Sequence, residues 1–196
     1  MVKSTPLRPR QIDDPKRIRV LASPVRHEIV DTLSALGGTV TVAQLAEHLG
    51  RHADGLYYHL KLLTQASLIE EMTREGGERA FRLAGGGRAP LRLAYRTERR
   101  ANANALAGYA RGLLKVAQRD FVQALKDPEV IASGKRRRLW AARNKGWLSE
   151  RDLAEVNELL ERLCTLTSQH REPGRDILVS LAFSLAPLEA LAKRRE

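Results

Sequence analysis

The stretch around residues 53–63 carries side chains that could recognise a ligand through hydrogen bonds. Tyr57 and Tyr58 offer two hydroxyls and two apolar rings, and Lys61 adds a cation. Three leucines recur at the spacing of one helical stripe, which predicts a helix that buries them and turns its other side to solvent: Leu56, Leu60 and Leu63. Such a side could contact base edges in a DNA groove, and packing of the tyrosines against a neighbouring hairpin is the alternative.

The outward side of this helix should also include Ala53 and Asp54, whereas His59 lies beside the leucine stripe and is interpreted as a packing or phosphate-orienting residue. Three arginines elsewhere are candidates for contact with a nucleic-acid backbone or a minor groove: Arg26, Arg74 and Arg79. Each has a structural alternative, which is a carboxylate partner for the first and a solvated turn for the other two.

Residue patterns of catalysis and metal binding are missing from the sequence. It contains no phosphate-binding loop, no nucleophile elbow and no pair of carboxylates framed by apolar residues, so we expect no enzyme. Cys164 is the single cysteine, so an internal disulfide is excluded, which fits a reducing compartment. The Cys164 thiol is either an inert packing group or a redox-active group. The histidines lack ligand spacing, so we expect neither a metal nor a cofactor: His27, His48, His52, His59 and His170.

The elements that would position the recognition side lie within residues 15–84, after a basic arm at 1–14 that we expect to be mobile. Asp14-Pro15 and Ser23-Pro24 are helix starts, because a capping side chain precedes a proline at the first helical position. Thr41-Val42-Ala43-Gln44 has capping-box spacing, and Gly50 ends that helix just before the leucine-striped one begins. Runs at 68–72 and 80–83 flank a Gly-Gly turn and predict a hairpin. Together these elements predict a winged helix-turn-helix.

A glycine linker at 85–89 separates this unit from the segment 90–127, whose Ala, Leu and Arg content predicts one long helix. Small residues at spacings of 4, 3 and 4 form a seam along it, with two leucines nearby: Ala101, Ala105, Gly108 and Gly112, then Leu106 and Leu113. Small residues let two helices approach closely, so the seam predicts pairing with an identical helix in a dimer. Packing within the same chain is the alternative.

The C-terminal region, 128–196, is predicted to be a small strand–helix–strand unit. Residues 136–147 should be extended, a helix should run from Ser149 to about Ser168, and residues 177–186 alternate with period two, which is typical of a strand. One stripe of that helix is apolar (Leu153, Val156, Leu160 and Leu163). The unit would add dimer contacts or take a small-molecule effector, and Trp140 and Trp147 could line an effector pocket or belong to the core.

Charge is strongly uneven along the chain. The 196 residues have a net charge of +11, divided into +3 for residues 1–88, +10 for residues 89–147 and −2 for residues 148–196. Such a balance favours a polyanionic partner, nucleic acid first and an anionic membrane surface second, although an arginine-rich composition alone would also produce it. The sequence has no 18-residue apolar run and no secretory signal, so we expect a cytoplasmic protein without a membrane partner.

Four segments in one order resemble the ArsR-type winged-helix repressors over residues 15–84: 21–30, 41–50, 57–63 and the hairpin. The resemblance implies a bacterial, homodimeric regulator, a repressor by family precedent, that binds a pseudo-palindromic operator in double-stranded DNA. Three residues depart from the family pattern: His52 replaces the usual capping residue, Gly55 replaces a frequent DNA contact, and Ser67 replaces a turn glycine. The family's metal-binding cysteine pair, which would fall near residues 40–45, is absent.

Two other functions compete with this interpretation. The +10 middle segment could make the chain a non-specific, architectural nucleic-acid binder. The winged helix could also serve only as a protein-interaction module. The fold expected in every case is mainly α, with an N-terminal winged helix-turn-helix, a long dimerisation helix and a small C-terminal α+β unit.

Overall fold

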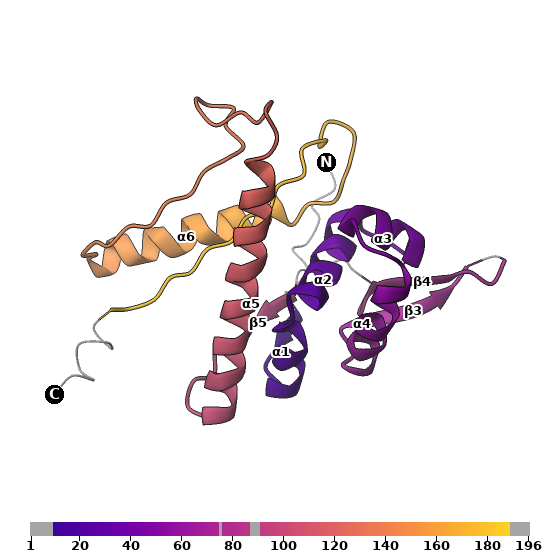
Figure 1. Ribbon diagram of the computed structural model, residues 1–196. Helices are drawn as coiled ribbons and strands as arrows, with labels where there is room; N and C mark the ends of the chain where they lie inside the picture. Colours follow the sequence, from indigo (N-terminus) through magenta and orange to yellow (C-terminus); the bar gives the residue numbers. More distant parts are fainter. Residues whose placement is uncertain (1–9, 75, 87–90, 189–196) are drawn as a thin grey trace, which may run out of the picture.

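The computed structural model describes residues 10–74, 76–86 and 91–188 (Figure 1). Within these residues the chain is mainly α-helical, as the sequence predicts. The helices are α1 (Pro15–Leu21), α2 (Pro24–Leu36), α3 (Val42–Leu49), α4 (Asp54–Gln65), α5 (Arg100–Ala124) and α6 (Glu150–Thr167). The strands are β1 (Arg10–Ile12), β2 (Val40–Thr41), β3 (Ile69–Thr73), β4 (Arg79–Leu83) and β5 (Leu91–Leu93).

The N-terminal half is a winged helix-turn-helix, which confirms the predicted architecture. Helices α3 and α4 form the helix-turn-helix pair, and β3 and β4 form the wing. Strand β2 joins the wing to make an antiparallel sheet in the order β2-β4-β3, with Val40 opposite Phe81 and Glu71 also opposite Phe81 on the other side. This short sheet anchors the wing beside α4 (Figure 1).

Local sequence signals set the helix boundaries. The Asp14 side chain accepts a hydrogen bond from the Lys16 amide at the start of α1. Thr41 and Gln44 form the predicted capping box of α3, and Gly50 ends α3 in the left-handed conformation at φ 58°. Ser67 is also left-handed, at φ 53°, so this position does make the left-handed turn into the wing for which a glycine was expected.

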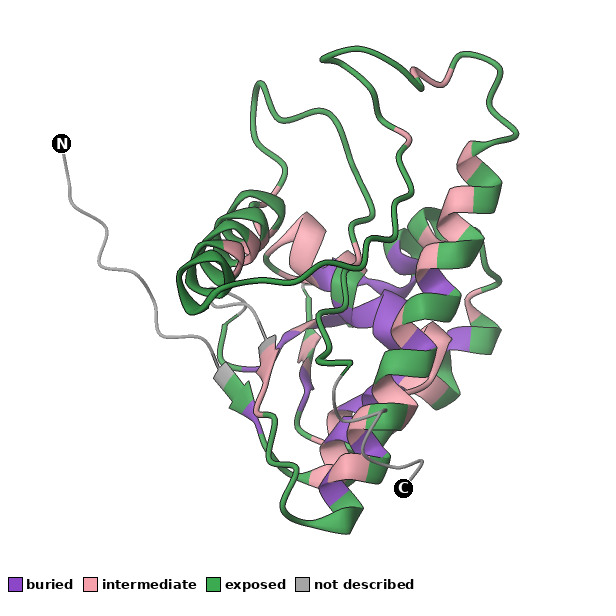
Figure 2. Ribbon diagram, turned by 90° about the vertical axis from the view of Figure 1, so that its left-hand side faces the viewer, coloured by how far each residue is buried: buried purple, intermediate pink, exposed green. Residues whose placement is uncertain are grey.

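One hydrophobic core holds the winged helix together. The predicted stripe of α4 is buried, and it packs with apolar residues of α1, α2, α3 and the sheet: Ile18, Ile29, Leu33, Leu45, Leu56, Leu60, Leu63, Ile69 and Phe81. Figure 2 shows the buried segments gathered in this part of the molecule and along one side of α5, whereas the C-terminal segments are exposed almost throughout. The core therefore fixes α4 with its opposite side outward.

Two predicted boundaries are wrong. Residues 10–12 belong not to a mobile arm but to strand β1, which pairs in parallel with β5 and buries Ile12; residues 1–9 lie outside the described part. The long helix begins at Arg100 rather than at residue 90, because residues 91–93 are used as β5. A three-residue strand is too short to show a period in the sequence. Of the predicted linker, Gly85 and Gly86 turn with positive φ, and 87–89 are not described.

The small-residue seam of α5 packs against α1 of the same chain, not against a twin. Ala105 is buried in the core, Gly108 lies beside Ala22, and a Cβ on Gly112 would collide with the Ala22 carbonyl oxygen. Leu106 also packs on the core, Leu113 is half-buried, and Ala101 is exposed. The spacing predicted a close helix–helix approach correctly, but the partner helix is intramolecular.

The C-terminal region contains one of its three predicted elements. Helix α6 forms with a capping box between Ser149 and Asp152, whereas the predicted strands at 136–147 and 177–186 are extended chain without a sheet. The chain after α6 is hydrogen-bonded to the end of α2, where His170 Nδ1 lies 2.7 Å from the Ser34 carbonyl oxygen and the Arg171 amide donates to the Ala35 carbonyl. A strand needs a partner, and the described residues do not supply one.

Candidate nucleic-acid interface

Helix α4 presents its outward side beside the wing. Tyr57 is 40% exposed, Tyr58 is 65% exposed, and Asp54 and Lys61 are also exposed. Ala53 is different from the prediction, because it precedes the helix and packs partly against the core. The helix start has no side-chain cap, as the His52 departure suggested, and Asp54 supplies the acidic group of the first turn.

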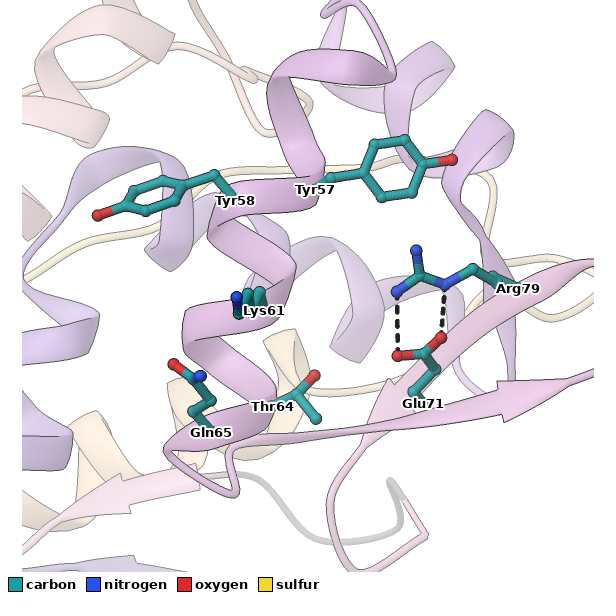
Figure 3. Close-up of a pocket in the computed structure, with 7 residues that line it drawn as sticks. All are labelled: Tyr57, Tyr58, Lys61, Thr64, Gln65, Glu71 and Arg79. Atoms are coloured by element: carbon teal, nitrogen blue, oxygen red, sulfur yellow. Dashed lines mark hydrogen bonds and ion pairs between the residues drawn. The ribbon is translucent and has the colours of Figure 1, made fainter.

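A shallow groove of about 350 Å³ runs between α4 and the wing (Figure 3). Its lining comes from three elements: Tyr57, Tyr58, Lys61, Thr64 and Gln65 of α4, Glu71 of β3 and Arg79 of β4. Figure 3 shows Tyr57 directed toward Arg79 and Tyr58 on the opposite side of the helix. The structure therefore brings together three predicted residues of α4 and one predicted arginine of the wing.

The wing arginine is held by a carboxylate that the sequence analysis did not identify. Arg79 Nε lies 2.5 Å from Glu71 Oε1, and Nη2 lies 3.1 Å from Oε2, so the pair is bidentate. The hydrogen bond to Arg79 lowers the pKa of the Glu71 carboxyl. The same guanidinium lies 5.3 Å from the centre of the Tyr57 ring, which orients the tyrosine as well. The register of the hairpin could have indicated this ion pair, because Glu71 and Arg79 are diagonal neighbours at exposed sites of the wing.

The other two predicted arginines have intramolecular partners. Arg74 donates to the Thr39 carbonyl oxygen at the base of the wing. Arg26 Nε donates to the Val20 carbonyl oxygen at 2.5 Å, so it ties α2 to the end of α1. Burial lowers the pKa of the Arg26 guanidinium. Arg26 therefore holds a backbone carbonyl rather than a carboxylate in this structure, and its contact with a DNA phosphate stays a prediction.

His59 lies on the protein side of α4, as its place beside the leucine stripe predicted. Its Nδ1 atom is buried without a hydrogen-bond partner in the part of the chain that the structure describes. Burial lowers the pKa of His59, and the positive charges of Arg26 and Arg51 lower it further. The lowered pKa favours the neutral imidazole, which supports packing rather than charge-based contact with a phosphate.

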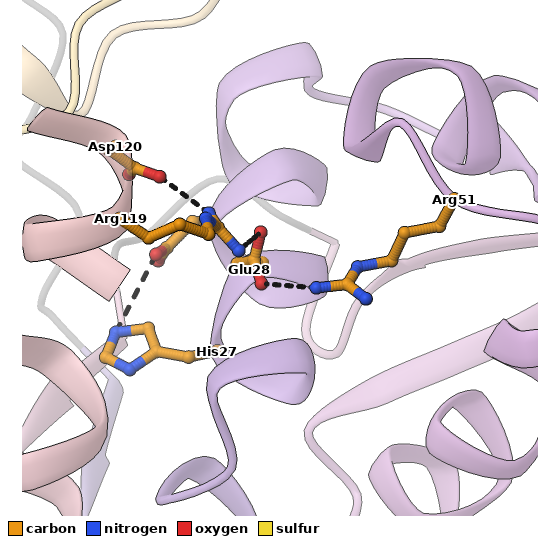
Figure 4. Close-up of polar contacts among 6 residues, drawn as sticks. His27, Glu28, Arg51, Arg119 and Asp120 are labelled. Atoms are coloured by element: carbon orange, nitrogen blue, oxygen red, sulfur yellow. Dashed lines mark hydrogen bonds and ion pairs between the residues drawn. The ribbon is translucent and has the colours of Figure 1, made fainter. Parts of the chain in front are cut away.

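A buried carboxylate behind the helix-turn-helix joins it to the long helix (Figure 4). Glu28 of α2 accepts from Arg51 in the α3–α4 turn, with 3.3 Å between Nη2 and Oε2. Arg119 of α5 approaches its other oxygen, with 2.6 Å between Nη1 and Oε1. The Glu28 side chain is 8% exposed. This cluster fixes the turn that precedes α4, and no sequence pattern links three positions so far apart.

A second contact between α2 and α5 lies beside this cluster. The rings of His27 and Tyr109 stack with 4.9 Å between their centres, and Tyr109 Oη lies 3.3 Å from His27 Nε2. Burial raises the pKa of the Tyr109 hydroxyl. Together the two contacts dock the long helix on the back of the helix-turn-helix.

The predicted effector pocket is not formed. Trp147 is 95% exposed, and Trp140 lies under the Arg137 guanidinium at 3.6 Å from the ring centre while remaining mostly in solvent. Neither tryptophan enters the core or lines a cavity described here. Across residues 10–74, 76–86 and 91–188, no group of three or more His, Cys, Asp or Glu side chains is placed so that it could hold a metal ion. No helix in the same ranges has the length and apolar character needed to cross a bilayer.

Comparison with known families identifies one domain. The family described as a helix-turn-helix domain matches residues 21–71, from the last residue of α1 to within β3. No curated protein matches the chain. The matched range contains α2, α3 and α4, so the chain carries a helix-turn-helix domain of the kind found in DNA-binding regulators.

Proposed function

We propose that this protein is a sequence-specific transcriptional regulator that binds double-stranded DNA as a homodimer and acts as a repressor. The observation that carries the proposal is the orientation of α4. Its leucine stripe is buried while Tyr57, Tyr58 and Lys61 are left open next to the wing. A recognition helix needs this orientation to enter a major groove. In a bacterium, where the chromosome lies in the cytoplasm, such a regulator works in the cytoplasm.

Each exposed side chain has a distinct task in this proposal. Lys61 contacts a phosphate or a guanine edge, and the tyrosines contact bases through their hydroxyls and the thymine methyl group through their rings. Arg79 contacts the backbone or the minor groove from the wing. Two copies related by a two-fold axis would read half-sites about one helical turn apart, which explains the expectation of a pseudo-palindromic operator.

The positive middle segment favours a second candidate, a non-specific architectural binder. Residues 89–147 hold most of the excess positive charge. Helix α5 of this segment lies on the side of the helix-turn-helix away from α4, so its charge is separate from the recognition helix (Figure 1). Competition with random duplex separates the two functions. A specific regulator prefers its site by about 10³-fold or more, whereas an architectural binder shows almost no preference.

A matched pair of substitutions tests the recognition surface. The probe is the duplex that the protein itself enriches from a random-sequence library, and the readout is affinity by fluorescence anisotropy. Lys61→Gln on α4 should weaken binding to this duplex by about 10-fold, since it removes one groove or phosphate contact. Lys115→Gln, which removes an exposed lysine of α5, should leave it unchanged.

If Lys115→Gln weakens binding and Lys61→Gln leaves it unchanged, DNA binding belongs to the basic middle segment. If no duplex is enriched and the protein retains no DNA at low salt, the winged helix serves protein interaction instead.

A further inference from the structure

The C-terminal region leaves most of the molecule's exposed apolar side chains in water. The described residues contain 20 large apolar side chains that are exposed, and 14 of them lie at or beyond Trp140. No residue of α6 is buried, although the structure describes the whole helix. In Figure 1, most of α6 lies on the side of α5 that faces away from α4 and the wing. Soluble monomers rarely expose so much apolar surface in one region.

The sequence of this region has the patterns of packed elements. Leu153, Val156, Leu160 and Leu163 form one stripe of α6, which is the pattern of a helix that covers a core. Residues 177–185 place an apolar side chain at every odd position, which is the pattern of a strand with one covered face. In the described residues this segment has no hydrogen-bonded partner strand and no layer that covers its apolar face. The apolar sides of α6 and of residues 177–185 therefore lack a core to pack in.

The exposed area matches what an interface needs. At roughly 60 Å² left in water by each half-exposed side chain, 13 side chains from Trp147 onward expose about 800 Å². One partner of a standard specific interface buries about 800 Å². A surface of this size is sufficient for a stable dimer without any contribution from the α5 seam.

We infer that α6 and residues 177–188 form a self-association surface, which packs against the same surface of a second copy of the chain. Residues 177–185 of the two copies pair as antiparallel strands across a two-fold axis and turn their odd-numbered side chains onto the two α6 helices. An antiparallel pair of identical strands is compatible with a two-fold axis, and the facing edges satisfy each other's backbone groups. The inference takes the homodimer of the proposed function as its premise and says where the subunits meet.

Charge favours a second copy over other occupants. Residues 131–149 carry six Lys or Arg and no acid, whereas α6 carries five acidic and two basic residues. In the described part of the chain none of these groups forms an ion pair. A two-fold partner brings the basic segment of each subunit to the acidic helix of the other. An anionic membrane surface, in contrast, would be repelled by the five acids of α6.

The test measures the mass of the full-length chain by sedimentation equilibrium without DNA. We expect a dimer for the wild type. The double variant Val179→Lys/Leu181→Lys changes the odd face and should raise the dissociation constant at least 100-fold. The matched variant Ser180→Lys/Ser184→Lys adds the same charge to the even face and should remain dimeric. All four positions are exposed, so far-ultraviolet circular dichroism should show unchanged helix content.

Amide exchange supplies a second readout. The amides of residues 177–185 should exchange slowly at concentrations where the dimer is populated and rapidly after dilution to the monomer. A wild-type chain that sediments as a monomer would overturn the inference, and so would an odd-face variant that dimerises like the wild type. A dimer that behaves as expected but binds no DNA would keep this inference and remove the proposed function.

Discussion

At the scale of single residues, the proposed DNA-binding surface contains an arginine that already has an ion-pair partner. Glu71 holds Arg79 in a bidentate pair, and Arg79 in turn lies over Tyr57. A DNA phosphate that approaches the wing must compete with Glu71 and would itself be repelled by the carboxylate. Glu71 should therefore limit affinity while keeping the wing side chains ordered in the free protein.

Replacement of this carboxylate should strengthen DNA binding. Glu71→Gln removes the competing charge, and we expect affinity for the enriched duplex to rise about 3- to 10-fold, which is in the range of one surface ion pair. Arg79→Gln should lower affinity. In an Arg79→Gln background the Glu71 substitution should have a much smaller effect, as a double-mutant cycle measured by anisotropy would show. Equal gains in both backgrounds would mean that Glu71 acts only through its own charge.

The Glu28 cluster is a stability feature at the same scale. Glu28→Gln should lower the free energy of unfolding by about 1–2 kcal/mol, below the ~3–5 kcal/mol typical of breaking a fully buried pair. The loss is smaller because the Arg51 and Arg119 side chains are 37% and 47% exposed and can turn to solvent. Urea denaturation measures it.

The matched control for this substitution is Glu47→Gln, which changes an exposed carboxylate of α3 and should stay within about 0.5 kcal/mol of the wild type. Equal stability of the two variants would show that the Glu28 ion pairs contribute no net free energy.

At the scale of elements, the packing of α5 on α1 determines where the long helix sits. Gly112 makes the closest approach, because a Cβ there would meet the Ala22 backbone, whereas a Cβ on Gly108 would lie 3.6 Å from the Ala22 Cβ at ordinary contact distance. The two glycines belong to the same helix and lie one turn apart. They therefore offer a direct comparison between a packing requirement and helix propensity.

Opposite effects are expected from one substitution at these two positions. Gly112→Ala should destabilise the protein by about 1–3 kcal/mol, since α5 must move away from α1 to admit the methyl group. Gly108→Ala should stabilise it by up to about 1 kcal/mol, since alanine is the better helix former and space is available. Thermal denaturation of both variants distinguishes them, and a gain at both positions would show that α5 is not held against α1.

The elements also show which structural information is local. The α4 stripe, the capping box of α3 and the left-handed Gly50 were predicted correctly, because neighbouring residues determine them. The seam of α5 predicted a close approach but could not say which helix approaches. The extended run 177–185 predicted a strand, and this prediction failed because pairing needs a partner outside the run.

The candidate site was predicted in part for the same reason. Tyr57, Tyr58 and Lys61 follow from the leucine stripe of their own helix. Arg26 and Arg74 are DNA-contact candidates by residue type, and their hydrogen bonds to backbone carbonyls depend on tertiary contacts that the sequence does not show. The clusters around Glu28 and Glu71 were missed, since each joins separate elements.

At the scale of the whole molecule, subunit number should be visible in the salt dependence of DNA binding. Each phosphate contact adds about 0.9 to the slope of log affinity against log salt concentration. Lys61→Gln removes one cation from each recognition helix. If Lys61 contacts a phosphate, the slope should therefore fall by about 2 for a bound dimer and by about 1 for a bound monomer, which titrations at several salt concentrations would measure.

The exposed run at 177–185 has one more consequence, for handling the purified protein. An uncovered segment with alternating apolar residues and free backbone groups is a template for cross-β stacking between molecules. Aggregation should then follow the concentration of free monomer, which rises only about as the square root of the total concentration once the dimer predominates. Light scattering over days of storage should therefore increase less steeply with total concentration for the wild type than for the odd-face variant that stays monomeric, if that variant still aggregates.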